Sequence, residues 1–185
     1  TPVNEGLVVS EEKYEVHACE AEHSVTTFSY LFKEKEKPGT FYPEKASALG
    51  VPKGKLWHKL QQGEEITIEN KSIKPSQVLG PNISGKKIGV SGDTRPTKKL
   101  EKFFRNCDYL IFDSTFSDEL REKAIQSCHS TAKEAAVFAK NADVKNLILT
   151  HFSARYKDEN VLLNEAKTIH NSVIAANDQL KIDVV

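Results

Sequence analysis

The second half of the sequence alternates short apolar runs with segments of helical periodicity, and this alternation constrains the fold more than any other feature. The apolar runs are residues 87–90, 108–112, 146–149 and 172–175. The helical segments are residues 98–107, 131–142 and 160–170, with a further helix expected to begin at 117–119. This pattern is typical of a sheet whose parallel strands are joined by right-handed helical crossovers. The sequence therefore predicts an α/β fold, with residues 181–185 pairing at an edge of the sheet.

Length and composition exclude several classes of protein. The 185 residues carry 26 basic and 26 acidic side chains, which fits a globular chain and disfavours a wholly basic nucleic-acid binder. No apolar run is long enough to cross a bilayer, and no signal peptide is recognisable, so we expect no membrane partner. Three cysteines, an odd number, disfavour a disulfide framework and favour a reducing, cytoplasmic setting.

Residues 7–32 and 33–85 differ from the second half. Aromatic and β-branched residues in the first of these segments predict strands at 7–9, 14–18 and 25–32. The second segment is punctuated by Gly and Pro, and its part from 33 to 62 has seven Lys against three Glu. Short helices are expected there at 43–49 and 56–60. Because apolar residues are sparse, we interpret 33–85 as an inserted arm and not as part of the core.

Polar clusters follow three of the predicted strands, where the sites of layered α/β folds form. Asp93, Asp113 and His151 lie in these clusters, and His129 stands just before a predicted helix. Imidazole and carboxylate groups are usual zinc ligands, and a carboxylate can bridge two metals. Each residue also has a simpler interpretation when taken alone. Asp93 could cap a turn, His151 could be a packed histidine, and His129 could belong to a helix N-terminus.

Several strings taken together are more specific than any single residue. They are Ser-Gly-Asp-Thr-Arg-Pro at 91–96, Asp-Ser-Thr-Phe at 113–116, His-Ser-Thr at 129–131 and Leu-Thr-His-Phe-Ser-Ala-Arg-Tyr at 149–156. Upstream strings are Glu-His-Ser-Val at 22–25, Lys-Pro-Gly-Thr-Phe at 37–41, Leu-Gly-Val-Pro at 49–52 and Leu-Trp-His-Lys-Leu-Gln-Gln-Gly-Glu at 56–64. This combination resembles the ribonuclease Z family, tRNA 3′-processing endoribonucleases of the metallo-β-lactamase superfamily.

The resemblance implies an αββα sandwich with an inserted flexible arm, and it implies roles for individual residues. The metal ligands would be His23 on one zinc, His151 on the other, and Asp93 bridging the two. Asp113 and His129 would form a proton relay in which the histidine protonates the departing 3′ oxygen. The phosphate or the site walls would be supported by Arg95 and Arg155, and precursor tRNA would be gripped by arm residues Lys53, Lys55 and Lys59. The family also implies a homodimer.

The most important departure from the family is a missing motif of metal ligands. The string His-x-His-x-Asp-His, which supplies most metal ligands in the family, does not occur here. Together with the absence of Met and a first residue of Thr1, this leads us to expect the C-terminal part of a longer enzyme. Its missing N-terminal part would be a partner. The isolated chain, residues 1–185, would then bind zinc weakly or not at all and would not turn over.

Two smaller departures concern the relay and the arm. The relay carboxylate is Asp113 where the family has Glu, and the family's Pro-Gly-Pro in the arm is Lys53-Gly54-Lys55. The second change replaces a turn restricted by proline with a looser turn that carries positive charge. Two alternatives remain open: a non-catalytic RNA-binding or interaction module, and another phosphodiesterase of the same superfamily.

Overall fold

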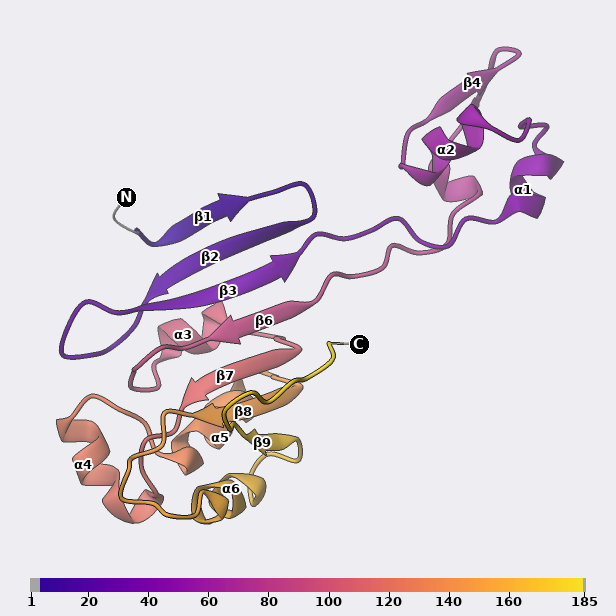
Figure 1. Ribbon diagram of the computed structural model, residues 1–185. Helices are drawn as coiled ribbons and strands as arrows, with labels where there is room; N and C mark the ends of the chain where they lie inside the picture. The colour runs from indigo at the N-terminus through magenta and orange to yellow at the C-terminus, as the bar shows by residue number, and fades with distance from the viewer. Residues whose placement is uncertain (1–3, 185) are drawn as a thin grey trace. The chain divides into compact units, whose positions relative to one another are not determined.

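The computed structural model describes residues 4–184, which divide into two compact units (Figure 1). Residues 4–34 and 86–184 form the larger unit, and residues 35–85 form the smaller one. Each unit has a hydrophobic core of its own.

The larger unit is built on a seven-stranded mixed sheet in the order β1-β2-β3-β6-β7-β8-β9. The strands are β1 (Gly6–Ser10), β2 (Tyr14–Glu20), β3 (Phe28–Glu34), β6 (Lys87–Val90), β7 (Tyr109–Asp113), β8 (Asn146–Thr150) and β9 (Val173–Ala175). The pairs from β1 to β6 are antiparallel, and those from β6 to β9 are parallel. The parallel half coincides with the strand–helix alternation of the sequence, because only a crossover can join parallel neighbours.

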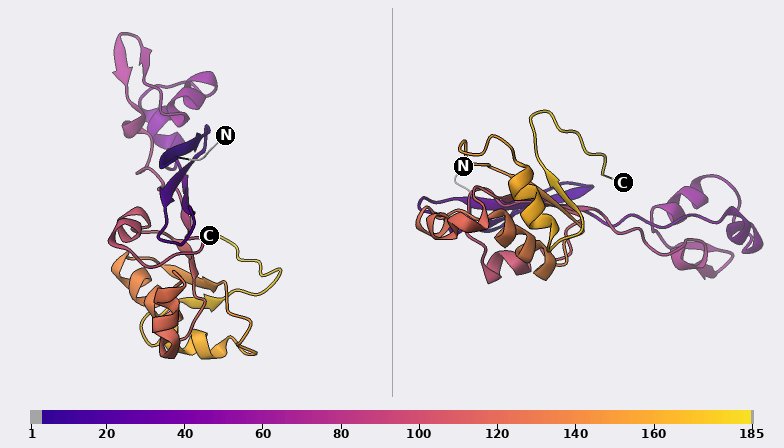
Figure 2. Two further views of the ribbon diagram at one scale, coloured as in Figure 1. Left: turned by 90° about the vertical axis from the view of Figure 1, so that its left-hand side faces the viewer. Right: turned by 90° about the horizontal axis from the view of Figure 1, so that it is seen from below.

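Helices cover one face of this sheet. They are α3 (Lys98–Phe103), α5 (Ala132–Asn141) and α6 (Asn160–Lys167), while α4 (Arg121–Gln126) follows the short 3-10 helix η2 (Asp118–Leu120). Leu110 and Phe112 of β7 point into the core beneath them, as do Leu147 and Leu149 of β8. Small alanines on the buried side of α5 let this helix approach the sheet closely. In the left view of Figure 2, the orange helices and the C-terminal segment lie on opposite sides of the sheet.

The alternate positions of the same strands form the second face, and they are apolar too. Successive side chains of a strand point to opposite faces, so these residues turn away from the helices. They are Val16, Tyr30, Phe32, Ile88, Val90, Tyr109, Ile111, Ile148 and Ile174. None of them belongs to the helix-covered core, and Tyr30 and Val90 remain 37% and 40% exposed. Strands that are apolar on both faces are typical of sheets covered by a layer on each side.

The smaller unit is a compact fold with its own core. Its elements are α1 (Pro43–Ala48), α2 (Lys55–Gln61), the hairpin of β4 (Ile66–Ile68) and β5 (Lys71–Ile73), and the 3-10 helix η1 (Pro75–Gln77). Its buried residues are Ala46, Val51, Leu60, Ile66, Ile73 and Val78. The few apolar residues of this segment are thus brought together in a small core that their sparse distribution along the sequence did not indicate.

Two details of the predicted elements were wrong. The helix expected at 98–107 ends at Phe103, and Asn106 then takes a left-handed conformation with φ of 59° that turns the chain into β7. Residues 181–184 form no strand, and Val185 lies outside the described residues. Within residues 4–184, no helix combines the length and the hydropathy required to span a bilayer.

Candidate metal centre

Four of the predicted site residues meet at the carboxyl ends of β6, β7 and β8. These strands are parallel neighbours in register, so their ends lie at one edge of the sheet. Asp113 is the last residue of β7, and His151 follows β8 directly. Asp93 lies in the loop after β6, and His129 lies between α4 and α5. The potential ligand atoms of Asp93, Asp113, His129 and His151 all lie within 4.8 Å of one another.

Asp113 is the buried hub of this cluster. Its Oδ2 accepts hydrogen bonds from the Thr94 N–H at 3.0 Å and from Nδ1 of His129 at 2.8 Å. Its Oδ1 accepts from the Thr115 N–H at 3.1 Å and from the Thr115 hydroxyl at 2.7 Å. A buried carboxylate is tolerated when donors surround it in this way, because they replace the water that it loses.

The three imidazoles of the site form a row of contacts, in which His151 is stacked on His129 and His23 is tilted against it. The His129 ring lies 4.9 Å from the His151 ring at an interplanar angle of 20°, and 4.9 Å from the His23 ring at 59°. Nδ1 of His129 donates to a carboxylate, so its Nε2 points away from Asp113. Nδ1 of His23 lies 3.0 Å from the carbonyl oxygen of Cys128, which likewise leaves its Nε2 free. Nε2 of His151 lies 3.5 Å from Oδ2 of Asp93.

The backbone is strained at two of the positions that shape this row. His151 and Cys128 have φ values of 63° and 58°, in the left-handed region that non-glycine residues rarely adopt. The carbonyl oxygen of Cys128 is the one that contacts Nδ1 of His23. Strain of this kind persists where the surrounding structure enforces it, and it is found at functional sites.

The donor set fits a divalent metal ion. Carboxylate oxygens and imidazole nitrogens are the ligands that zinc takes. The residues of the cluster differ in their exposure to solvent. The side chains of Asp93 and His151 are 41% and 46% exposed, so they are accessible to an ion, whereas the Asp113 side chain is fully buried. Four of the five predicted metal-binding and relay residues are thus brought into one cluster, with His23 packed against His129 beside it.

Arg95 lies in the wall of the site and is engaged with protein groups. Its guanidinium pairs through both terminal nitrogens with the Glu134 carboxylate, and it also donates to the carbonyl of His129. Burial by itself would raise the pKa of Glu134, but the contacts with Arg95 and with the Thr131 N–H lower it. Arg95 therefore fixes the loop that carries His129.

The other residues predicted to contact the substrate, Arg155 and three arm lysines, do not belong to this cluster. Arg155 stacks over Phe116 at 5.0 Å and donates from Nε to Ser153 Oγ at 2.9 Å. The arm lysines Lys53, Lys55 and Lys59 are exposed in the smaller unit.

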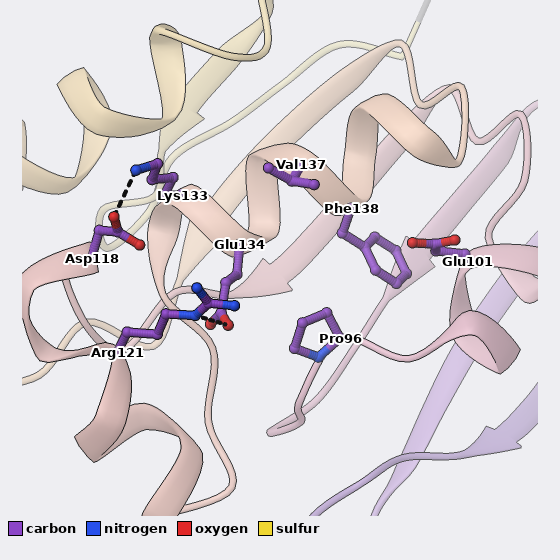
Figure 3. A pocket seen from close by; sticks show the side chains of 8 residues that line it. All are labelled: Pro96, Glu101, Asp118, Arg121, Lys133, Glu134, Val137 and Phe138. Carbon is purple, nitrogen blue, oxygen red and sulfur yellow. Dashed lines mark hydrogen bonds and ion pairs between the residues drawn. The ribbon is translucent and has the colours of Figure 1, made fainter.

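A pocket on the outer side of α5 borders this wall but is not the metal centre (Figure 3). Its lining residues are Pro96, Glu101, Asp118, Arg121, Lys133, Glu134, Val137 and Phe138. Figure 3 shows two pairs among its charged groups, Lys133 with Asp118 and Arg121 with Glu134, whose atoms lie 2.6 and 3.3 Å apart. None of the four clustered residues lines it.

Sequence reasoning missed three residues that hold the site together: Thr94, Thr115 and Glu134. Glu134 had a readable signal, since Thr131 and Glu134 have the spacing of a capping box and form one at the start of α5. Thr94 contributes its backbone N–H, which no sequence pattern reveals. Thr115 is one of several hydroxyl residues in the string at 113–117, and nothing in the sequence distinguishes it from its neighbours.

The fold and this centre together define the class of protein. The chain belongs to the metallo-β-lactamase superfamily, since residues 55–152 match the profile described as Beta-lactamase superfamily domain. Within that superfamily it is a homologue of ribonuclease Z. It is 59% identical over 182 residues to Ribonuclease Z of Nitrosopumilus maritimus and 43% identical over 180 residues to that of Methanosarcina acetivorans. The resemblance expected from the motifs is confirmed.

The chain matches only part of the length of each relative. The alignments include 98% and 97% of this chain but only 61% and 59% of the two relatives, so the chain spans about three fifths of their length. Two solved structures share its fold. The short form of human tRNase Z matches 97% of this chain and 46% of its own, with a TM-score of 0.60 and 23% identity. YhfI of Bacillus subtilis, a metallo-beta-lactamase fold protein, matches 91% and 48%, with a TM-score of 0.57 and 16% identity. The predicted α/β metallo-β-lactamase fold is confirmed.

Proposed function

We propose that this chain provides part of the active site of a zinc-dependent endoribonuclease that removes the 3′ trailer of precursor tRNA. The observation that carries the proposal is the cluster of Asp93, Asp113, His129 and His151 on a chain homologous to ribonuclease Z. Zinc would be held by His23, Asp93 and His151, with further ligands from polypeptide beyond these 185 residues. Bound zinc supplies charge that offsets the phosphate and lowers the pKa of a coordinated water.

The Asp113–His129 pair is suited to proton transfer. The carboxylate accepts the Nδ1 proton of His129 at 2.8 Å and thereby orients the ring. A protonated His129 would carry its second proton on Nε2 and deliver it to the 3′ oxygen as the phosphorus–oxygen bond breaks. The fixed negative charge of Asp113 stabilises the imidazolium before that transfer. Arg95, through the His129 carbonyl, keeps the ring in place.

The smaller unit would bind the body of the tRNA. Lys53, Lys55 and Lys59 are exposed there, and lysine contacts to phosphates need no particular base sequence. Each phosphate neutralised in this way adds to the salt dependence of binding. Replacing all three lysines by Gln should weaken tRNA binding and flatten its slope against salt concentration by about 2–3 on a log–log scale. An unchanged slope would remove the arm from the proposal.

The second face of the sheet supports the participation of further polypeptide. Tyr30, Phe32, Ile88, Val90 and Ile111 present an apolar surface outside the helix-covered core. Sheets with apolar side chains on both faces pack against a second layer about 10 Å away. The relatives have about two fifths of their length beyond the part that this chain matches, which is enough to provide such a layer. We therefore expect the chain alone to be inactive.

The decisive experiment is a chimera. This chain would replace the 182 matching residues of the Nitrosopumilus maritimus relative, which shares 59% identity with it. The chimera should release the 3′ trailer of a precursor tRNA in the presence of zinc. Asp93→Asn should lower the rate by at least about 100-fold, since losses of that size follow even when only a partner of a ligand is removed. Asp143→Asn, at a surface pair with Arg105, is the matched control and should leave the rate unchanged.

Other outcomes would identify the alternatives. A chimera that binds tRNA with a steep salt dependence but never cleaves it would indicate a non-catalytic RNA-binding module. A chimera that hydrolyses small phosphodiesters but not precursor tRNA would indicate another phosphodiesterase of the superfamily. Cleavage retained in Asp93→Asn would refute the assignment of the metal centre.

A further inference from the structure

Thr115 connects the buried carboxylate of the site to one of its exposed imidazoles. Its hydroxyl oxygen lies 2.7 Å from Oδ1 of Asp113 and 2.8 Å from Nδ1 of His151. The residue is buried, and its own N–H also donates to Asp113 Oδ1 at 3.1 Å. These contacts complete an unbroken chain of hydrogen bonds from His129 through Asp113 and Thr115 to His151.

The direction of each bond in this chain follows from counting protons. A hydroxyl has one proton to donate, and an ionised carboxylate can only accept. Asp113 is surrounded by donors on both oxygens, so Thr115 must donate its proton to Oδ1. The Thr115 oxygen is then an acceptor toward His151, and the short contact of 2.8 Å requires a proton on Nδ1. The Nε2 lone pair of His151 is left facing Asp93.

We propose that Thr115 is a positioning residue that fixes the tautomer of His151 and makes it depend on Asp113. His23 and His129 need no such help, because a carbonyl and a carboxylate can only accept from their Nδ1 atoms. A hydroxyl can act either way, and the Asp113 carboxylate at 2.7 Å decides which, since the Asp93 carboxylate lies 3.5 Å from Nε2 of His151, beyond the usual length of an N–H···O hydrogen bond. The consequence for zinc rests on the proposed function: an imidazole with its lone pair on Nε2 is ready to bind metal.

The test reads the tautomer directly and needs neither metal nor substrate. Long-range proton–nitrogen correlation spectra of the metal-free 185-residue chain show which ring nitrogen of each histidine carries the proton. They would be recorded well above pH 6.5, about the ordinary pKa of imidazole, so that the rings are neutral. Thr115→Val removes the hydroxyl at nearly constant volume, and Thr115→Ser restores it. Ser114→Ala is the matched control, since that buried hydroxyl bonds to the Phe112 carbonyl at 3.0 Å and not to the site.

In the parent chain, in Thr115→Ser and in Ser114→Ala, His151 should be protonated on Nδ1. In Thr115→Val its signals should shift to those of the Nε2–H form, while His129 keeps its proton on Nδ1. A parent chain with His151 protonated on Nε2 would overturn the proposal, whether or not Thr115→Val folds. An unchanged His151 tautomer in a folded Thr115→Val would do so too. Because no cleavage is measured, failure here is distinguishable from failure of the chimera.

Discussion

Replacing Asp113 by Asn tests the hub of the site with almost no change in volume. The carboxylate of Asp113 receives four hydrogen bonds, two from backbone N–H groups and two from side chains, and it is buried. The amide of Asn offers one oxygen that accepts and one NH₂ that only donates. The NH₂ group of the Asn side chain must therefore lie against groups that also donate hydrogen bonds.

Neither orientation of the amide can satisfy the site. If the NH₂ occupies the place of Oδ2, it meets the Thr94 N–H and forces His129 to accept at Nδ1, which moves the histidine proton to Nε2. If it occupies the place of Oδ1, it meets the Thr115 N–H instead. A buried backbone N–H loses its partner in both cases. In the first orientation His129 adapts by moving its proton to Nε2, and in the second the Thr115 hydroxyl adapts by accepting from the amide and turning its proton toward Nδ1 of His151.

The size of the effect can be worked from these losses. A buried N–H without a partner costs about 1–3 kcal/mol, and a lost charge-assisted hydrogen bond costs about 1.5–3 kcal/mol. Asp113→Asn should therefore lower the free energy of unfolding by about 3–5 kcal/mol, the range typical for breaking a buried pair. With a urea dependence of about 2 kcal/mol per M, the unfolding midpoint should fall by about 2 M. In the active chimera, loss of the oriented acid should lower kcat by about 100- to 10,000-fold.

Urea unfolding of the parent chain and of Asp113→Asn provides the measurement, with Asp143→Asn as the control at an exposed carboxylate. A loss of stability below about 1 kcal/mol would refute the reasoning, because a single unpaired buried donor already exceeds it. The spectra that report tautomers give a second check. Asp113→Asn should move the proton either of His129 or of His151 from Nδ1 to Nε2, and a variant in which both histidines keep their Nδ1 protons would contradict the reasoning.

Three further predictions concern packing and acid sensitivity. Gly89→Ala should destabilise the larger unit by about 1–3 kcal/mol in urea unfolding, because the added Cβ would lie 2.5 Å from the buried Phe104 ring. Leu60→Ala should cost the smaller unit about 2–5 kcal/mol while the imidazole signals of the site stay unchanged, since the two cores are separate. The lowered pKa of Glu134, paired with Arg95, means that its contribution to stability is complete above about pH 4.3 and declines as the pH falls further. Glu134→Gln should therefore differ most from the parent near neutral pH, and a gap that widens in acid would contradict this.

The meeting of the site residues was predictable because it follows from the topology. Once strands at 87–90, 108–112 and 146–149 are parallel neighbours, residues that directly follow them share one edge. Asp93, Asp113 and His151 needed only their places in the sequence relative to those strands. The grouping of side chains on the two faces of each strand was also predictable, because alternate residues of a strand point to the same face of the sheet.

The core of the smaller unit could not be predicted from a count of apolar residues, because such a count ignores where those residues converge. Residues such as Leu60 and Val78 are far apart in the sequence, and both are fully buried in one small core. Charged residues dominate the composition around them because they occupy the surface of a unit that has much surface for its volume. The sparse apolar residues of this segment therefore did not reveal that it has a core of its own.

The positions of the protons on the histidine rings of the site depend on contacts that cannot be read from the sequence. The carbonyl of Cys128 reaches His23 from a left-handed residue, and the donation by Thr115 depends on which atoms surround Asp113. Each imidazole thus contacts through Nδ1 an acceptor that is distant from it in the sequence, which leaves the Nε2 atoms for a ligand. Residue types and spacing indicate that a metal could bind here. The readiness of the nitrogens to bind it follows only from the folded arrangement of the acceptors behind them.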